Sequence, residues 1–285
     1  MTSIADKALL TQLQVSQWTA RKYDRKATEK VAQDNNADVT AGRYNKSLLP
    51  MTDALKKVHQ YTTVIRTEYY SNTLPWGING TQILPARNFM EFSQEFRAMK
   101  GRWLGLVSDF CGDYVLHKHN AQQFLGSLYN EDDYPDATEI RRKFSIDMSV
   151  FPVPTNDFRV QIGNDELQRI QKDVETRVQD AASNAMQEVW KRLYERVSHM
   201  ADKLGDPSSI FRDTLVENTV ELCALLPKLN FMDDPDLEAA RQEVEAKLCY
   251  DPDSLRHDLD LRKDVAGRAK DIADKMGAFM GVLDG

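Results

Sequence analysis

The residues best suited to bind a charged ligand form a basic and aromatic segment near the N-terminus. The stretch QWTARKYDRKATEK, residues 17–30, mixes aromatic rings with lysine and arginine, and residues 43–46 continue the pattern. Such cations neutralise phosphates while aromatic rings stack on exposed bases. The candidate anion- or nucleic-acid-binding residues are Trp18, Arg21, Lys22, Tyr23, Arg25, Lys26, Lys30, Arg43 and Lys46. A solvated helix start, or a basic arm that docks on the acidic tail of a neighbouring copy, explains the same residues.

A second candidate site is the loop TLPWGINGTQILPARNF, residues 73–89. Its Asn-Gly pair favours a tight turn, because both residues tolerate positive φ. The spacing of its glycines matches no phosphate-binding loop. The apolar residues around the turn predict a corner plug over helix ends. The alternative is a ligand or partner pocket formed by Trp76, Asn79 and Arg87.

Metal-binding and catalytic patterns are weak. Asp113 and His117 are four residues apart, which suits metal ligation on one helical face, but a solvated helix end explains them equally. Residues 251–264 resemble a calcium loop, yet Arg256 stands where glycine is needed and Arg262 replaces the closing glutamate. The chain also lacks a Walker A motif, a G-x-S-x-G elbow and an H-E-x-x-H motif. We therefore expect no metal site, no cofactor and no catalytic residue.

The composition predicts a globular protein with an uneven charge. Of 285 residues, 41% are hydrophobic and 28% charged, and the net charge is −7. Residues 1–50 carry eight Lys and Arg against five Asp and Glu, whereas residues 205–285 carry ten against 18. A basic front and an acidic tail favour head-to-tail self-association or an anionic partner, although solvated helix faces explain them too.

Cysteine usage and hydropathy predict a cytoplasmic protein. Cys111, Cys223 and Cys249 show no C-x-x-C spacing, so we expect reduced thiols rather than a disulfide framework. The N-terminus lacks a basic region followed by a long apolar run, which predicts no signal peptide. No apolar stretch approaches the roughly 20 residues that span a bilayer, so no membrane partner is expected.

Proline placement and apolar periodicity predict a mainly α fold. Asp-Pro pairs at 206–207, 234–235 and 251–252 resemble capped helix starts. The predicted helices cover about 51–70, 86–117, 119–128, 136–143, 165–204, 208–226, 235–248 and 253–280.

One predicted helix is unusually long. Apolar residues recur every three or four positions from Leu167 to Leu204, which predicts a helix of about 60 Å at 1.5 Å per residue. A helix of this length needs a long partner, and residues 87–117 carry a wide apolar face. We therefore expect an elongated helical bundle built on a long antiparallel helix pair.

Only one β element is predicted. Residues 144–150 and 158–162 alternate apolar and polar side chains on either side of the turn PVPTND, which indicates a small β-hairpin near 144–162. The expected organisation is a basic N-terminal segment over 1–50, then an elongated helical domain over 51–285 with the hairpin inserted at about 144–163.

The chain resembles uncharacterised bacteriophage and prophage helical proteins of similar length. The similarity lies in WTARKYDRKAT, GRYNKSLLP, the NTLPWG loop, and DYPDATEIRRKF followed by PVP, all between residues 18 and 154. The resemblance implies a phage context, such as DNA metabolism or interference with the host.

These features together predict a non-enzymatic phage-type protein. We expect it to form homo-oligomers and to act through protein–protein surfaces on host or phage proteins, with local nucleic-acid contact by its N-terminal segment. One alternative is a binding inhibitor that sequesters a host defence protein or a small ligand at Trp76. Another is an enzyme with a dispersed carboxylate or Cys/His site. The expected location is the host cytoplasm, with a place in the virion as the alternative.

Overall fold

The computed structural model describes residues 3–50, 53–77, 80–155 and 164–283. This part of the chain holds ten α-helices and two small antiparallel sheets, which confirms the mainly α prediction. None of the helices in it has the length and apolar character needed to cross a bilayer.

The chain divides into two compact units. Unit 1 comprises Met1–Gln12, Tyr69–Ser93 and Ser149–Gly285, and unit 2 comprises Leu13–Glu68 and Gln94–Met148. Four elements contribute to both units: β1 (Ala8–Ser16), α3 (Asp53–Asn72), α4 (Ala86–Gly112) and β6 (Ser145–Pro152). Residues 1–50 are divided between the two units, with Met1–Gln12 in unit 1 and the remainder in unit 2.

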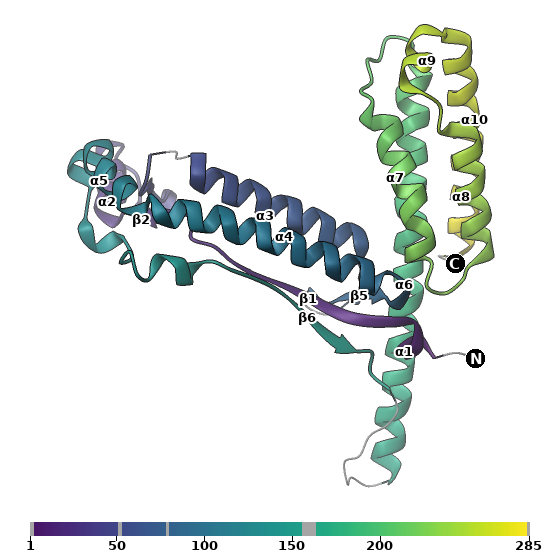
Figure 1. Cartoon of the computed structure of the whole chain (residues 1–285), viewed down its shortest axis with the longest axis horizontal. Helices are drawn as coiled ribbons and strands as arrows, with labels where there is room; N and C mark the ends of the chain where they lie inside the picture. Colours follow the sequence, from purple (N-terminus) through teal and green to yellow (C-terminus); the bar gives the residue numbers. More distant parts are fainter. Residues whose placement is uncertain (1–2, 51–52, 78–79, 156–163, 284–285) are drawn as a thin grey trace. The chain divides into compact units, whose positions relative to one another are not determined.

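The core of unit 1 is a bundle around α6 (Asn164–Gly205). Against it pack α7 (Thr214–Leu229), α8 (Pro235–Leu248) and α10 (Leu259–Leu283), while α9 (Pro252–His257) leads into α10 (Figure 1). The apolar period of α6 places Val189, Leu193 and Val197 in the interior with no exposed surface. The long helix along α6 in this bundle is α10, so the predicted pairing of α6 with residues 87–117 is not confirmed.

Local capping explains where these helices begin. Asp234 accepts hydrogen bonds from the N–H groups of Asp236 (2.9 Å) and Leu237 (3.2 Å), and Asp251 accepts one from Ser254 (2.9 Å). Two predicted Asp-Pro caps are thus confirmed. The third is wrong. Asp206 accepts from the N–H of Ser208 (2.9 Å) in a turn, and α7 begins only at Thr214.

Other predicted helix bounds also need correction. The helix expected at 253–280 is interrupted at Asp258, which accepts from the N–H of Leu261 (2.9 Å) and starts α10. The break expected before residue 119 falls at Asp113, where α4 ends and α5 (Tyr114–Leu125) begins. The helix expected at 136–143 is wrong, because only a 3₁₀ turn forms there, at Ile140–Lys143.

The larger sheet has the strand order β4-β5-β1-β6, with β4 at Leu74–Pro75 and β5 at Gln82–Pro85. β1 pairs antiparallel with β5, in a register that places Leu9 opposite Leu84. Sequence reasoning missed β1 because its burial does not alternate regularly. The neighbours Leu10 and Thr11 are both buried, and the Thr11 hydroxyl lies 2.9 Å from that of Tyr69.

The expected hairpin is confirmed only in its first strand, β6. Residues 158–162, its expected second strand, lie outside the described residues, and the neighbour of β6 in the described sheet is β1. The prediction of a single β element is wrong. A second sheet pairs β2 (Arg21–Tyr23) with β3 (Asn45–Ser47).

Unit 2 is built around α3 and α4, which lie side by side in it (Figure 1). A buried hydrogen bond joins them, from Trp103 Nε1 to Thr62 Oγ1 (2.8 Å). Aromatic rings fill the far end of this core, where Phe110 lies 5.7 Å from Phe144 and 6.0 Å from Tyr114 between ring centroids. Helix α2 (Arg25–Asp34) follows β2 in the chain.

Candidate functional site

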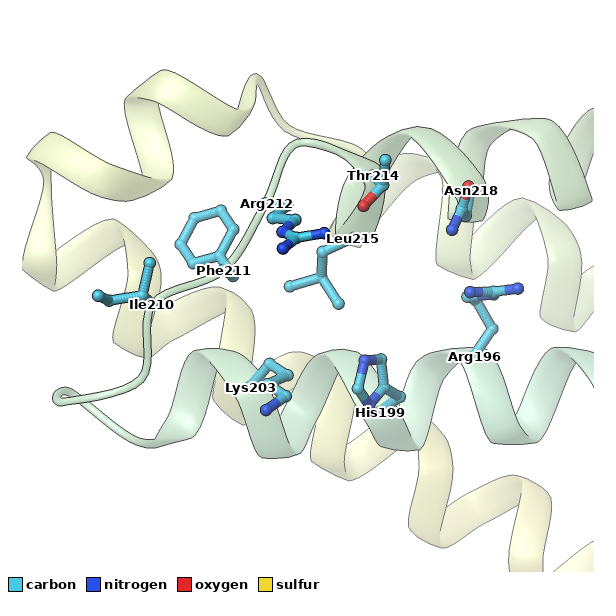
Figure 2. A pocket seen from close by; sticks show the side chains of 9 residues that line it. All are labelled: Arg196, His199, Lys203, Ile210, Phe211, Arg212, Thr214, Leu215 and Asn218. Carbon is cyan, nitrogen blue, oxygen red and sulfur yellow. The ribbon is translucent and has the colours of Figure 1, made fainter. Parts of the chain in front are cut away.

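A basic pocket of about 250 Å³ lies in unit 1 between the last turns of α6 and the start of α7. Its lining residues are Arg196, His199, Lys203, Ile210, Phe211, Arg212, Thr214, Leu215 and Asn218. The first three project from one face of α6, because positions three and four apart stack on a helix (Figure 2). The segment before α7 and its first two turns supply the rest.

The pocket is positively charged. Arg196, Lys203 and Arg212 form no ion pair with any described residue. Two carboxylates close to these residues in the chain have other partners: Asp213 pairs with Arg256, and Asp206 accepts hydrogen bonds from Ser208. The Ser208 hydrogen bonds, and to a smaller extent the charges of Arg262 and Lys203, lower the pKa of Asp206 below its usual value.

A buried arginine fixes the segment that closes the pocket. Arg262, on α10, is 7% exposed and donates to four carbonyl oxygens: those of Leu204 (3.1 Å), Lys203 (3.1 Å), Asp206 (2.7 Å) and Ser209 (2.8 Å). These include orphan carbonyls at the C-terminus of α6, where a cation also complements the helix dipole.

The same arginine packs against the pocket wall. Its guanidinium lies 5.3 Å from the ring centre of Phe211, and that of Arg256 lies 5.2 Å from it. Cation–π contacts at these distances are attractive. The connection between α6 and α7 is therefore held by side chains of α9 and α10, and the pocket is preformed.

The two ends of the pocket differ in polarity. Arg196 and Asn218 face each other at one end, while Ile210 lies at the opposite end, beyond Lys203 (Figure 2). Ile210 is 94% exposed, whereas Phe211 and Leu215 are buried beneath the surface. Arginine, lysine, hydroxyl and amide groups donate hydrogen bonds to oxyanions, so this lining suits an anion with an apolar neighbour.

The predicted basic segment lies in unit 2, and part of its charge is used internally. Lys46 is buried, and its Nζ contacts Asp133 Oδ2 (2.7 Å), Asp24 Oδ2 (3.0 Å) and the carbonyl of Leu128 (2.7 Å). Lys22 pairs with Asp133 Oδ1 (2.8 Å). Burial alone would lower the pKa of Lys46, but hydrogen bonds to Asp133 and Asp24 outweigh it and raise this pKa.

The aromatic residues of the segment also have internal partners. Trp18 packs on Tyr114 (5.8 Å between ring centres) and on Phe110 (6.2 Å). The guanidinium of Arg43 lies over the ring of Tyr23 at 4.6 Å. Arg25 pairs with Glu29 (2.7 Å), but Arg21, Lys26 and Lys30 are exposed and form no ion pair within the described ranges.

Trp76 and Arg87, two of the residues predicted to form a loop pocket, do not share one site. Trp76 is 8% exposed and belongs to the core of unit 1, between strands β4 and β5, as the corner-plug interpretation expects. Arg87 donates instead to the carbonyl of Pro227 (3.1 Å) and to Asp233 Oδ1 (2.6 Å). Asn79 lies outside the described residues.

No group of three metal-ligating side chains occurs in the part of the chain that the structure describes. Of the predicted Asp113–His117 pair, His117 lies in α5 and stacks on Phe110 at 6.0 Å between ring centres, whereas Asp113 precedes that helix.

The three cysteines differ in their environment. The neighbouring thiols of Cys223 and Cys249 influence each other: this interaction lowers the pKa of Cys249 and, together with burial, raises that of Cys223. Burial also raises the pKa of Cys111.

Because the thiolate is the reactive form, we expect Cys249 to be alkylated first at mildly alkaline pH. Timed alkylation read by peptide mass spectrometry checks this. A Cys249→Ser variant should lose the fastest site, and equal labelling of all three thiols would contradict the prediction.

Sequence reasoning did not find the basic pocket. Arg196, His199 and Lys203 border the apolar stripe of α6, so the sequence pattern predicts only an ordinary polar helix face for them. Spacing alone does not show that residues 210–218 fold back beside them. Comparison with models of protein families, with curated proteins and with solved structures finds no match to this chain.

Proposed function

We propose that this chain is a non-enzymatic binding protein and that the pocket between α6 and α7 holds an anionic group. The observation that carries the proposal is the lining: Arg196, Lys203 and Arg212 border one pocket and form no ion pair with any described residue. Like charges placed together are unfavourable, and a bound phosphate or carboxylate relieves this repulsion while accepting charge-assisted hydrogen bonds.

Titration of the full chain with inorganic phosphate at low salt, followed by calorimetry or NMR, tests the proposal. Changing Arg196, Lys203 and Arg212 together to glutamine should weaken binding by about a hundredfold or more, because each lost charge-assisted hydrogen bond contributes about 1.5–3 kcal/mol. The matched control changes three exposed lysines of unit 1 to glutamine, which alters net charge equally: Lys172, Lys191 and Lys270. If the control variant loses as much phosphate affinity, the effect is due to net charge alone, which would contradict a specific site.

We further propose that copies of the chain associate and act on host or phage proteins in the host cytoplasm. The uneven charge and the resemblance support this role, and so do Val115, Leu116 and Phe124, three strongly exposed apolar side chains on α5. Exposed apolar groups of this kind are typical of protein–protein contacts. As part of this proposal we keep the elongated bundle, in which residues 87–117 pair antiparallel with residues 165–204. A monomer at high concentration in light scattering would contradict association.

The N-terminal segment remains a second candidate for nucleic-acid contact, because Arg21, Lys26 and Lys30 stay exposed and unpaired within the described ranges. We expect the Arg21→Ala, Lys26→Ala, Lys30→Ala variant to bind a single-stranded oligonucleotide less tightly. The affinity of this variant should also depend less on salt concentration, since each lost phosphate contact removes about 0.7 from the slope of log K against log salt. Fluorescence anisotropy at several salt concentrations measures both quantities. Unchanged affinity would remove the proposed arm.

A further inference from the structure

We infer that the ligand of the basic pocket is a phosphate monoester whose organic part lies against Ile210, the chemical class that includes nucleoside monophosphates. This inference rests on the proposed anion-binding function and adds the class of ligand. It is carried by the charge of the pocket and by the polarity difference between its two ends.

The charge of the lining favours a dianion. Arg196, Lys203 and Arg212 are three cationic side chains, and the ring of His199 adds a further hydrogen-bonding group. A single carboxylate neutralises only one of the three. A phosphate monoester carries about −1.5 to −2 at neutral pH and offers three acceptor oxygens, so it compensates more of this charge.

The neutral donors of the pocket add to this preference. The Thr214 hydroxyl and the Asn218 amide lie beside the cations. Asp213 precedes α7 but makes no capping hydrogen bond to it, because its carboxylate pairs with Arg256. The N–H groups of Leu215 and Val216 donate to the carbonyls of Arg212 (3.0 Å) and Asp213 (2.9 Å), so the Thr214 hydroxyl and the Asn218 amide are the neutral donors that the pocket offers a ligand here.

The apolar end of the pocket favours an organic group beside the phosphate. Ile210 is 94% exposed, so its side chain loses water contact only when something covers it. Arg262 holds the carbonyls of Asp206 and Ser209 on the stretch before it, and Phe211 behind it is fixed between two guanidinium groups. Because the segment is already ordered, little conformational entropy is lost when a ligand covers Ile210.

The volume limits what the pocket encloses. At about 250 Å³ it lies below the range of roughly 300–1,000 Å³ for sites that enclose drug-sized ligands. It therefore accommodates the phosphate and the adjoining part of the organic group, while the rest of the ligand extends into solvent over Ile210.

Calorimetric titrations with inorganic phosphate, adenosine monophosphate and adenosine test the inference on the full chain. We expect the monophosphate to bind about tenfold more tightly than phosphate, and adenosine to bind far more weakly than either. Ile210→Ala should remove this gain while leaving phosphate affinity unchanged. Val220→Ala, which trims another exposed apolar residue of unit 1, should change neither. Both positions are exposed, so folding is preserved.

The outcomes separate the two proposals. If phosphate binds but the monophosphate gains nothing, or if Ile210→Ala weakens both ligands equally, the ligand class is wrong and the anion site stands. If neither anion binds, the proposed function fails as well. If a 5′-phosphorylated oligonucleotide binds as tightly as the monophosphate, the phosphate monoester is the end of a nucleic-acid strand. If it binds more weakly, the ligand is a free nucleotide. Equal binding of the same strand without its phosphate would overturn the inference.

Discussion

Replacing Arg262 by methionine is expected to lower the free energy of unfolding by about 3 kcal/mol, because four buried or partly buried carbonyl groups lose a charged donor. The carbonyls belong to Lys203, Leu204, Asp206 and Ser209, at the end of α6 and in the turn after it. Methionine keeps most of the side-chain volume but donates no hydrogen bond. The connection that carries Ile210 and Arg212 should therefore loosen.

Urea unfolding followed by circular dichroism measures this change. The matched control is Arg268→Met, on the same helix. The Arg268 side chain is 39% exposed, and its partners are Asp264 and the hydroxyl of Tyr250 (3.0 Å). Exposed pairs contribute little, so this variant should lose less than about 1 kcal/mol. Equal losses in the two variants would show that the carbonyl contacts of Arg262 carry no special weight.

Replacing Lys46 by methionine should be at least as costly, about 3–5 kcal/mol, because it leaves two carboxylates in a largely buried site without their shared cation. Asp133 and Asp24 lie 2.7 and 3.0 Å from Lys46 Nζ, and the Asp133 and Lys46 side chains are only 5% and 6% exposed. Lys22 still pairs with Asp133 after the change but reaches it from the solvent side. The matched control is Lys26→Met, an exposed lysine of the same segment, which should be nearly neutral.

The pH dependence distinguishes this network from simple packing. The pKa of Asp133 is lowered, because the hydrogen bonds from Lys22 and Lys46 outweigh the opposite effect of burial. A lowered folded-state pKa gives stability that is present above the ordinary aspartate value of 3.8 and is lost as pH falls through the folded value below it. The difference between wild type and Lys46→Met should therefore shrink as the solution is acidified below about pH 4. A difference independent of pH would indicate lost packing instead.

Helices with strong local signals could be predicted from the sequence. Residues 165–204 predict a helix that the structure places at Asn164–Gly205, and 235–248 matches α8 at both ends. The first prediction depends on apolar periodicity and the second on an Asp-Pro cap, and both signals act within a few residues. The helix expected at 208–226 forms as α7 but begins only at Thr214, because the Asp206–Ser208 turn competes locally with a helix start.

The roles of charged residues could not be predicted in this way. Lys46 reads as part of a basic surface, but Asp133, far along the chain, makes it an internal cation. Arg262 reads as a missing calcium ligand, yet it binds the end of α6. In both cases the partner is distant in sequence, and neither charge pattern nor spacing carries information about it.

By itself, then, the sequence determined the mainly α character, the long helix α6 and the caps of α8 and α9, since these depend on interactions between near neighbours. Only the tertiary structure decided that β1 and β5 pair, that Lys46 is buried, and that Arg196, Lys203 and Arg212 share a pocket. Contacts of this kind form when segments distant in the chain bury apolar surface together. Whichever polar groups those segments carry then become neighbours and must find partners or a ligand.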